Sequence, residues 1–255
     1  MKPRLLYLSI CFCFTMTTCF AEQFREPGKR GNLGEVTKLV NSTTNINQQD
    51  SMGFSILFYA AENNQYDSVK LLLKAGANLN LRDKTAKTPL HWAAGAGNKD
   101  IVLLLLEAGA APQAMDDDGS TPLIQAAAGG HLTTFQEVLK KDKRVNFAAK
   151  DGFTPLLAAC TGEKPDKHAL IHLLLTEGAD PNLCTKDGLS PLLVAIYAKD
   201  LKTVELLLCK GADPLKKEKQ AQSALEVAST MKNILGDSKL FDIIQESLRK
   251  KRPDK

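Results

Sequence analysis

Apolar residues recur along this chain at a fixed interval of 33 residues. A run with paired alanines, such as Ala93-Ala94, is followed by a turn and then by a leucine run such as Leu104-Leu105-Leu106. When the glycine or alanine that opens each copy is aligned, the steps are 33, 33, 33, 36 and 33 residues, at Gly53, Ala86, Gly119, Gly152, Gly188 and Ala221. A fixed period of this size is typical of small supersecondary units stacked on their neighbours. We therefore expect function to lie on the surface of a stack.

The residue pattern within each repeat predicts two helices. A Thr or Ser followed by Pro, as in Thr88-Pro89, is expected to cap and begin the first helix, where the missing proline N–H costs no intrahelical bond. Paired alanines allow successive first helices to approach closely, and the leucine triplets give the second helix its bulk. The glycine after each triplet is expected to end that helix with a positive φ. These glycines are Gly76, Gly109, Gly178 and Gly211.

The repeat pattern weakens at both ends and at one internal position. Between residues 24 and 50, Pro27-Gly28 predicts a short or broken first helix. The pattern restarts at Ser223, and one later helical face carries Leu240, Ile243, Ile244 and Leu248. Three extra residues around 162–166 predict a longer loop between the two helices of one repeat. This loop is either a neutral insertion or a local contact device.

The motif that starts at Thr88-Pro89-Leu90-His91 and continues to Leu104-Leu105-Leu106 resembles the ankyrin repeat. Partial copies are Thr121-Pro122-Leu123, Thr154-Pro155-Leu156 with Leu173-Leu174-Leu175, and Ser190-Pro191-Leu192 with Leu206-Leu207-Leu208. The resemblance implies an all-α solenoid of antiparallel helix pairs with β-hairpin-like fingers, a concave binding face and, usually, protein partners. It does not identify the partner.

On this resemblance, the repeat domain spans residues 22–248. We expect a degraded N-terminal cap at 22–52, a C-terminal cap at 221–248, and repeats at 53–85, 86–118, 119–151, 152–187 and 188–220. Residues 249–255 are a basic tail, either a solvated terminus or a contact for anionic lipid or nucleic acid.

The first 21 residues predict a secretory signal peptide. Lys2 and Arg4 precede an uncharged stretch that ends at Phe20, and Cys19 and Ala21 are small residues at the positions that a signal peptidase inspects. One alternative is a buried first helix, and another is a lipoprotein signal at Cys19, although the residues before it fit that motif poorly. We expect an exported, bacterial-type member of the family, periplasmic or secreted. No later apolar run approaches the ~20 residues of a membrane span.

Composition is that of an ordinary globular protein. The 255 residues are 44% hydrophobic and 24% charged, with a net charge of +4. Removing Lys2 and Arg4 with the signal leaves 31 basic against 29 acidic side chains, which is +2. This excess is too small to argue for nucleic acid. We therefore expect a protein partner, no nucleic acid, and a monomer.

The histidines do not assemble a convincing chemical site. His91 resembles the family histidine that hydrogen-bonds backbone between neighbouring repeats. His168 and His172 are four residues apart, a spacing that can bind metal on a helix, but neither a Glu between them nor a third ligand accompanies them.

The cysteines and the densest acidic run have ordinary explanations. Once the signal is removed, Cys160, Cys184 and Cys209 permit one disulfide, although they look like isolated substitutions. Residues 116–118 are three aspartates, which turn chemistry explains better than a calcium loop does. No nucleophile elbow, Walker loop or dinucleotide fingerprint occurs. We expect no catalysis, no cofactor and no metal.

The candidate binding residues are those at finger tips and at the ends of first helices that the repeat leaves free. They are Met52, Phe54, Glu62, Arg82, Lys84, Lys87, Met115, Asp117, Asp118, Lys150, Phe153, Leu189 and Tyr197. Exposed Phe, Met and Leu at turns contribute little to folding, and apolar anchors ringed by charges are typical of protein interfaces. The alternative is that loop tips tolerate any residue.

These observations predict a protein-binding module that uses the concave finger and first-helix face. Two other functions stay open. One is an envelope immunity or inhibitor-type protein that neutralises or protects a specific enzyme, and the other is an effector delivered into a host cell.

Overall fold

The structure is a computed structural model that describes residues 25–42, 45–217, 222–235 and 238–251. These residues form helices and turns, and no strand occurs among them. They divide into two compact parts, an N-terminal unit up to Asp117 and a C-terminal unit from Asp118. Within the described residues, no helix is long and apolar enough to cross a membrane. The predicted signal peptide lies outside the described residues.

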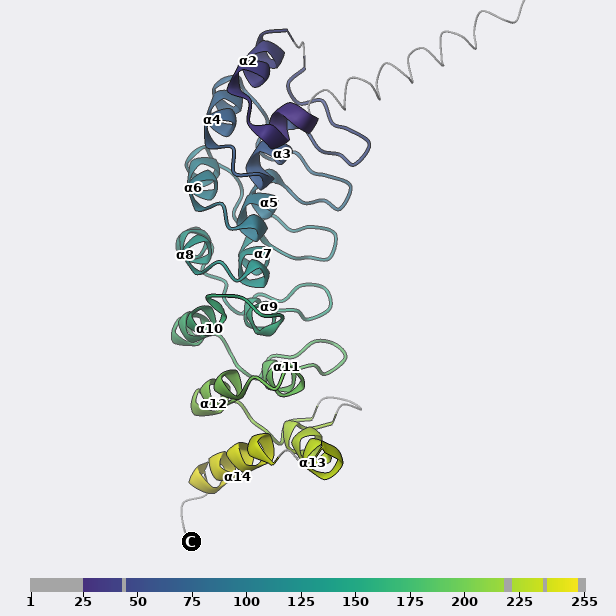
Figure 1. Cartoon of the computed structure of the whole chain (residues 1–255), viewed down its shortest axis with the longest axis vertical. Coiled ribbons are helices and arrows are strands. Elements are labelled where there is room, and N and C mark those ends of the chain that lie inside the picture. The colour runs from purple at the N-terminus through teal and green to yellow at the C-terminus, as the bar shows by residue number, and fades with distance from the viewer. Residues whose placement is uncertain (1–24, 43–44, 218–221, 236–237, 252–255) are drawn as a thin grey trace, which may run out of the picture. The chain divides into compact units, whose positions relative to one another are not determined.

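The N-terminal unit begins with a helical segment at residues 25–30. It continues with α2 (Leu33–Ser42), α3 (Ile56–Glu62), α4 (Tyr66–Lys74), α5 (Pro89–Ala96) and α6 (Lys99–Glu107). Figure 1 shows α3 and α5 in one column and α2, α4 and α6 in the other, with loops projecting from the α3 and α5 side. The predicted all-α stack of helix pairs is therefore confirmed, and we call the projecting loops fingers.

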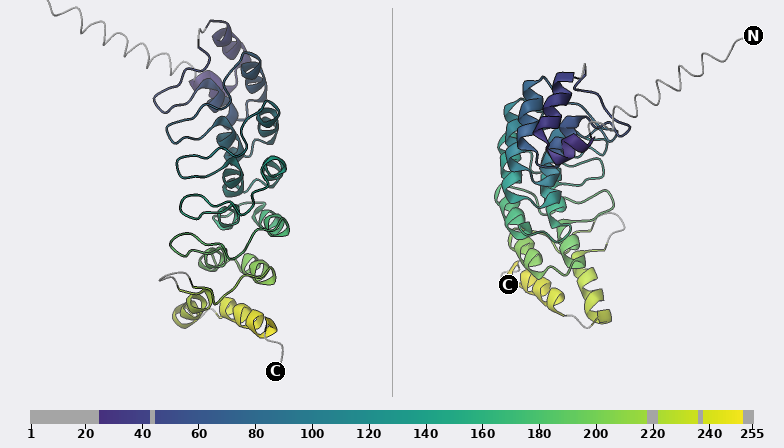
Figure 2. Two further views of the ribbon diagram at one scale, coloured as in Figure 1. Left: turned by 180° about the vertical axis from the view of Figure 1, so that it is seen from behind. Right: turned by 45° about the horizontal axis from the view of Figure 1, so that its top comes forward.

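The C-terminal unit repeats this arrangement. Its helices are α7 (Pro122–Gly129), α8 (Leu132–Lys141), α9 (Pro155–Cys160), α10 (Lys167–Thr176), α11 (Pro191–Tyr197), α12 (Leu201–Cys209), α13 (Ala224–Leu235) and α14 (Lys239–Lys251). The fingers of this unit project from the side of α9 and α11, as the view from behind in Figure 2 also shows. Its last helix runs into the predicted basic tail, as far as Lys251.

The helix starts are those that the Thr-Pro and Ser-Pro pairs predict. Helices α5, α7, α9 and α11 each begin at the proline. The hydroxyls of Thr121, Thr154 and Ser190 each accept a hydrogen bond from the backbone N–H three residues later, at 3.4, 3.3 and 3.2 Å. Each hydroxyl satisfies one backbone donor that a helix start otherwise leaves open.

The helix ends also agree with the prediction. The glycines that follow the second helices have φ values of +82°, +94°, +88° and +97°, at Gly76, Gly109, Gly178 and Gly211. A Cβ atom added at any of them would have no atom within 4 Å apart from those of the adjoining residues. Backbone conformation, and not lack of space, therefore requires glycine at these positions.

In the degraded N-terminal repeat, Gly28 is required by close packing and not by backbone conformation. Pro27 and Gly28 lie inside the short helical segment at residues 25–30. A Cβ atom added to Gly28 would lie 2.7 Å from Cβ of Tyr59, closer than real side chains approach. The short helix is as predicted, and its glycine allows the chain to pack directly on α3.

Candidate functional site

The fingers are hairpin-like turns, each closed by a backbone hydrogen bond. In the N-terminal unit, Asp50 donates to the carbonyl of Phe54 and Asp83 to that of Lys87, both at 2.9 Å. In the C-terminal unit, the fingers at residues 149–153 and 185–189 close in the same way, at 3.0 Å each. Each of these fingers is therefore a tight turn fixed by its own backbone.

Backbone hydrogen bonds also join neighbouring fingers. In the N-terminal unit, Lys84 N–H donates to the carbonyl of Met52 at 3.0 Å, and Asp117 N–H donates to that of Thr85 at 2.9 Å. In the C-terminal unit, Lys150 N–H donates to the carbonyl of Asp118 at 2.8 Å, and Lys186 N–H donates to that of Asp151 at 2.7 Å. The finger spacing is therefore fixed by the main chain, before any partner binds.

Two aspartates, the buried Asp83 and the half-buried Asp50, hold the fingers of the N-terminal unit in shape. Oδ1 of Asp83 accepts hydrogen bonds from the backbone N–H groups of Thr85 and Lys87 at 2.8 and 2.9 Å. Its Oδ2 accepts from Nε1 of Trp92 at 2.9 Å. Asp50 serves its own finger in the same way and accepts a hydrogen bond from the Tyr59 hydroxyl. Burial, together with this bond, raises the pKa of Tyr59.

An aromatic cluster lies at the base of these fingers. The ring of Phe54 lies 5.2 Å from those of Phe58 and Tyr59 and 5.1 Å from that of Trp92, centroid to centroid. Phe54 is half-buried by these contacts. The expectation that Phe54 is an exposed finger residue with little role in folding is therefore wrong, because its ring joins two successive repeats.

The remaining predicted residues of the N-terminal unit do lie at its surface or edge. Met52 is 59% exposed and Met115 is 47% exposed. Arg82, Lys84 and Asp117 are exposed, and Lys87 is half-buried with Nζ 5.4 Å from the centre of the Trp92 ring. Glu62 is half-buried at the end of α3.

The predicted residues of the C-terminal unit divide in the same way. Asp118 and Lys150 are exposed on fingers, and Tyr197 is 55% exposed at the end of α11. Phe153 and Leu189 are half-buried, so the expectation of exposed apolar side chains is wrong for both. The predicted methionines and most of the predicted charged residues are exposed, whereas Phe153 and Leu189 pack, and the sequence did not separate the two groups.

A buried ion pair in the C-terminal unit was not predicted. Lys167, the first residue of α10, is 1% exposed and places Nζ 2.8 Å from Oδ2 of Asp200, while Nε2 of His168 lies 3.1 Å from Oδ1. Burial alone would raise the pKa of Asp200, but its contacts with Lys167, His168 and Thr203 outweigh burial and hold that pKa well below the ordinary value. No sequence motif marked this pair, because its members lie one repeat apart.

The histidines have identifiable structural partners. Nδ1 of His91 accepts a hydrogen bond from the backbone N–H of Thr88 at 3.1 Å, within its own repeat. His168 contacts Asp200 as described, and His172 is exposed. Throughout the described ranges, no group of three His, Cys, Asp or Glu residues could hold a metal ion.

The cysteines are separate in the structure. Cys160 is buried at the end of α9 and Cys209 is exposed at the end of α12, both as free thiols, while Cys184 is half-buried in a finger. With two of the three thiols free, no disulfide joins any pair of them. Burial raises the pKa of the Cys160 thiol to about 12, which suppresses its reactivity.

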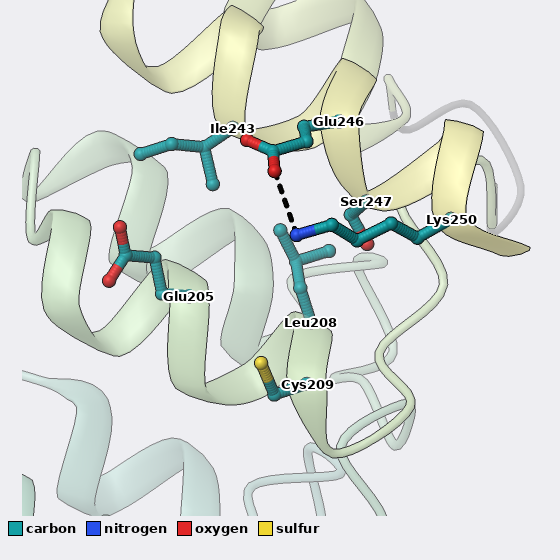
Figure 3. Close-up of a pocket in the computed structure, with 7 residues that line it drawn as sticks. All are labelled: Glu205, Leu208, Cys209, Ile243, Glu246, Ser247 and Lys250. Carbon is teal, nitrogen blue, oxygen red and sulfur yellow. Dashed lines mark ion pairs between the residues drawn. The ribbon is translucent and has the colours of Figure 1, made fainter.

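A groove of about 510 Å³ lies between α12 and α14 (Figure 3). Helix α12 contributes Glu205, Leu208 and Cys209, and α14 contributes Ile243, Glu246, Ser247 and Lys250. The ammonium of Lys250 is engaged by Glu246 at 2.7 Å. The groove does not assemble the nucleophile and oriented base that covalent catalysis requires.

Comparison with known proteins agrees with this repeated geometry. Residues 28–116 and 163–236, more than half of the chain, match the family model described as ankyrin repeats (3 copies). The chain belongs to the ankyrin repeat family. Proteins of this family are generally protein–protein interaction modules. Among curated protein sequences, none matches this chain.

Two solved ankyrin repeat domains illustrate the similarity. An ankyrin repeat domain from Acinetobacter baumannii AYE has a TM-score of 0.64 at 29% identity, over 74% of this chain and 98% of its own. The human ASB11 ankyrin repeat domain has a TM-score of 0.76 at 25% identity, over 91% of this chain and 99% of its own. The second similarity extends over most of the stack.

Proposed function

We propose that this ankyrin repeat protein binds a partner protein through its fingers and the adjoining ends of its first helices. The observation that carries the proposal is the pair of exposed methionines, Met52 and Met115, on fingers that backbone hydrogen bonds hold in place. Unbranched apolar side chains of this kind adapt to a partner surface. Because the fingers are already ordered, binding loses little conformational entropy.

A capture experiment with matched variants tests this proposal. The bait is the tagged chain, its Met52→Ser/Met115→Ser variant, or a control with Lys74→Ser and Glu107→Ser in the other helix column. Lys74 and Glu107 are exposed at the ends of α4 and α6. We expect the double methionine variant to lose the partner and the control to retain it. Equal recovery by all three baits would count against the finger surface.

We also propose that the chain acts outside the cytoplasm. The support is the predicted signal peptide at residues 1–21, with cleavage after Ala21. Intact-mass measurement of the protein from its native cells tests this, with Glu22 as the expected first residue. A chain that retains residues 1–21 in the cytoplasmic fraction would contradict the proposal.

A further inference from the structure

The charge presented by the finger at residues 83–87 and the residue before it is positive. Arg82 and Lys84 are exposed and Lys87 is half-buried on or beside this finger, whereas the next finger along the chain exposes Asp117 and Asp118. The acidic residues Asp50 and Asp83 are turned inward and accept hydrogen bonds from the finger backbones, and Asp116 is buried. Their charge is therefore committed to the fold and is not presented at the tips.

Each of these three residues contacts either a finger methionine's backbone or the Trp92 ring. Nη2 of Arg82 donates to the carbonyl of Met115 at 2.6 Å, and the backbone of Lys84 is bonded to that of Met52. The ammonium of Lys87 lies over the Trp92 ring. Within the part of the chain that the structure describes, none of these three side chains is in an ion pair. Their charges are therefore available to a partner.

The fingers of the C-terminal unit differ in charge. Each of the two fingers after Asp118 pairs a lysine with an adjacent aspartate at its tip, Lys150 with Asp151 and Lys186 with Asp187, and all four are exposed. Basic and acidic side chains alternate there, so those fingers present no net positive row. The positive row is a local property of the N-terminal unit and does not follow from the repeat.

We propose that this row binds an acidic polypeptide segment that also carries apolar side chains. Carboxylates of the segment would contact Arg82, Lys84 and Lys87, and its apolar side chains would pack on Met52 and Met115. This inference rests on the proposed function and adds the chemistry of the partner. Charge complementarity of this kind steers association and selects among partners.

The same surface fits a nucleic acid less well. Proteins that bind single strands without sequence preference stack bases on exposed aromatic rings. Here the ring of Phe54 is packed against three other rings, and the ammonium of Lys87 covers a face of Trp92. The exposed apolar side chains are methionines, which suit a polypeptide.

Binding of labelled peptides to the full chain tests the proposal. The probes are short fluorescent peptides of alternating Glu and Leu, Gln and Leu, or Lys and Leu, together with an oligothymidylate, followed by anisotropy. We expect the Glu peptide to bind most tightly and to weaken several-fold between about 50 and about 300 mM NaCl, because salt screens exposed charges. Tighter binding of the Gln peptide, the Lys peptide or the oligonucleotide, or no peptide binding at all, would overturn the inference.

Matched charge variants locate the binding. Replacing Arg82, Lys84 and Lys87 by Gln should weaken the Glu peptide by about tenfold or more, whereas the control Lys150→Gln/Lys186→Gln should change it less than about twofold. Lys84→Gln alone keeps the hydrogen bond of Arg82 and the contact of Lys87 with Trp92, so its partial loss of affinity cannot come from misfolding. Equal losses in the row and control variants would overturn the location.

The outcomes separate this inference from the proposed function. If the methionine variant loses its captured partner while the Gln variants retain it at low salt, the finger surface binds a protein but the positive row is not the determinant. If neither set of variants affects capture, the proposed function itself fails.

Discussion

Phe54 and Met52 flank the same finger glycine but have different roles. Met52 is 59% exposed, whereas the Phe54 ring contacts three aromatic neighbours, including Trp92 of the next repeat. Truncating Phe54 therefore removes packing that joins repeats, and truncating the mostly exposed Met52 removes little. The two positions allow folding and binding effects to be separated.

Phe54→Ala is expected to lower the free energy of unfolding by about 2 to 4 kcal/mol, since a half-buried aromatic ring loses its contacts. Met52→Ala should change it by less than about 0.5 kcal/mol, as exposed positions usually do. Urea unfolding followed by circular dichroism measures both. Equal stabilities of the two variants would contradict the assigned packing of Phe54.

The cysteines provide a second prediction for single residues. Cys160 is buried and its thiol pKa is raised to about 12, whereas Cys209 is exposed. At pH 8 only a fraction on the order of 10⁻⁴ of Cys160 is thiolate. Iodoacetamide should label Cys209 in the folded chain and Cys160 only after urea is added, as peptide mass mapping can show. Equal native labelling of both would contradict the structure.

The sequence showed that the residues on both sides of the finger glycine are apolar, but it did not predict how exposed each side chain is. Met52 and Phe54 are both apolar residues beside a finger glycine, and the local sequence pattern cannot tell which of the two is exposed. The difference arises in part because the ring of Trp92, one repeat later, packs against Phe54. Such a contact depends on the register between repeats.

At the scale of elements, the turns between paired helices carry contacts that join successive repeats. In the N-terminal unit, the residue that precedes the second helix donates to a carbonyl of the preceding repeat, as Gln65 does to Lys29 at 3.0 Å and Asn98 to Ala61 at 2.8 Å. Asp200 holds the same position before α12 and has no side-chain donor when ionised. It takes the buried cation of Lys167 from the preceding repeat instead.

The three-residue insertion lies directly before Lys167, the residue that pairs with Asp200. The loop at residues 161–166 contains the three extra residues and ends at Lys167. This geometry supports the interpretation of a contact device over a neutral insertion. The sequence predicted the position of this loop correctly, because the residues that start and end helices are local signals. It did not predict that the Lys167 side chain is buried, because lysine at the start of a helix is ordinarily exposed.

Asp200→Ser is expected to destabilise the chain by about 3 to 5 kcal/mol, because it leaves the buried Lys167 cation with only the exposed carboxylate of Glu163, 3.9 Å away. Serine retains a capping oxygen for the backbone of Thr203. The double variant Lys167→Met/Asp200→Ser should recover most of that loss, since it also removes the cation. Urea unfolding measures both, and a double variant no more stable than Asp200→Ser would contradict the pairing.

The same pair predicts a pH dependence. Because the folded pKa of Asp200 is depressed, its contribution is present above the ordinary aspartate pKa of ~3.9 and is lost as pH falls below that value. Between about pH 4 and pH 2, the unfolding free energy should fall more steeply for the natural chain than for Asp200→Ser. Parallel slopes would contradict this assignment.

At the scale of the whole molecule, the 33-residue period predicted the architecture of both units. Thr-Pro pairs, alanine pairs, leucine runs and terminal glycines are repeated local signals, so their agreement identified the family fold reliably. The partner could not be predicted in this way. The repeat fixes the residues that build the stack and leaves the fingers free to vary, and identity of the partner depends on those variable side chains.

Photo-cross-linking from defined positions tests the central claim, that the finger surface binds a protein, most directly. Benzoylphenylalanine is placed at Met52 or Met115 on the fingers, or at Glu107, which is exposed at the end of α6. After irradiation in the native cells, cross-linked products are identified by mass spectrometry. The account predicts one common protein partner from both methionine positions and none from Glu107. A partner cross-linked from Glu107, and from neither methionine position, would contradict it.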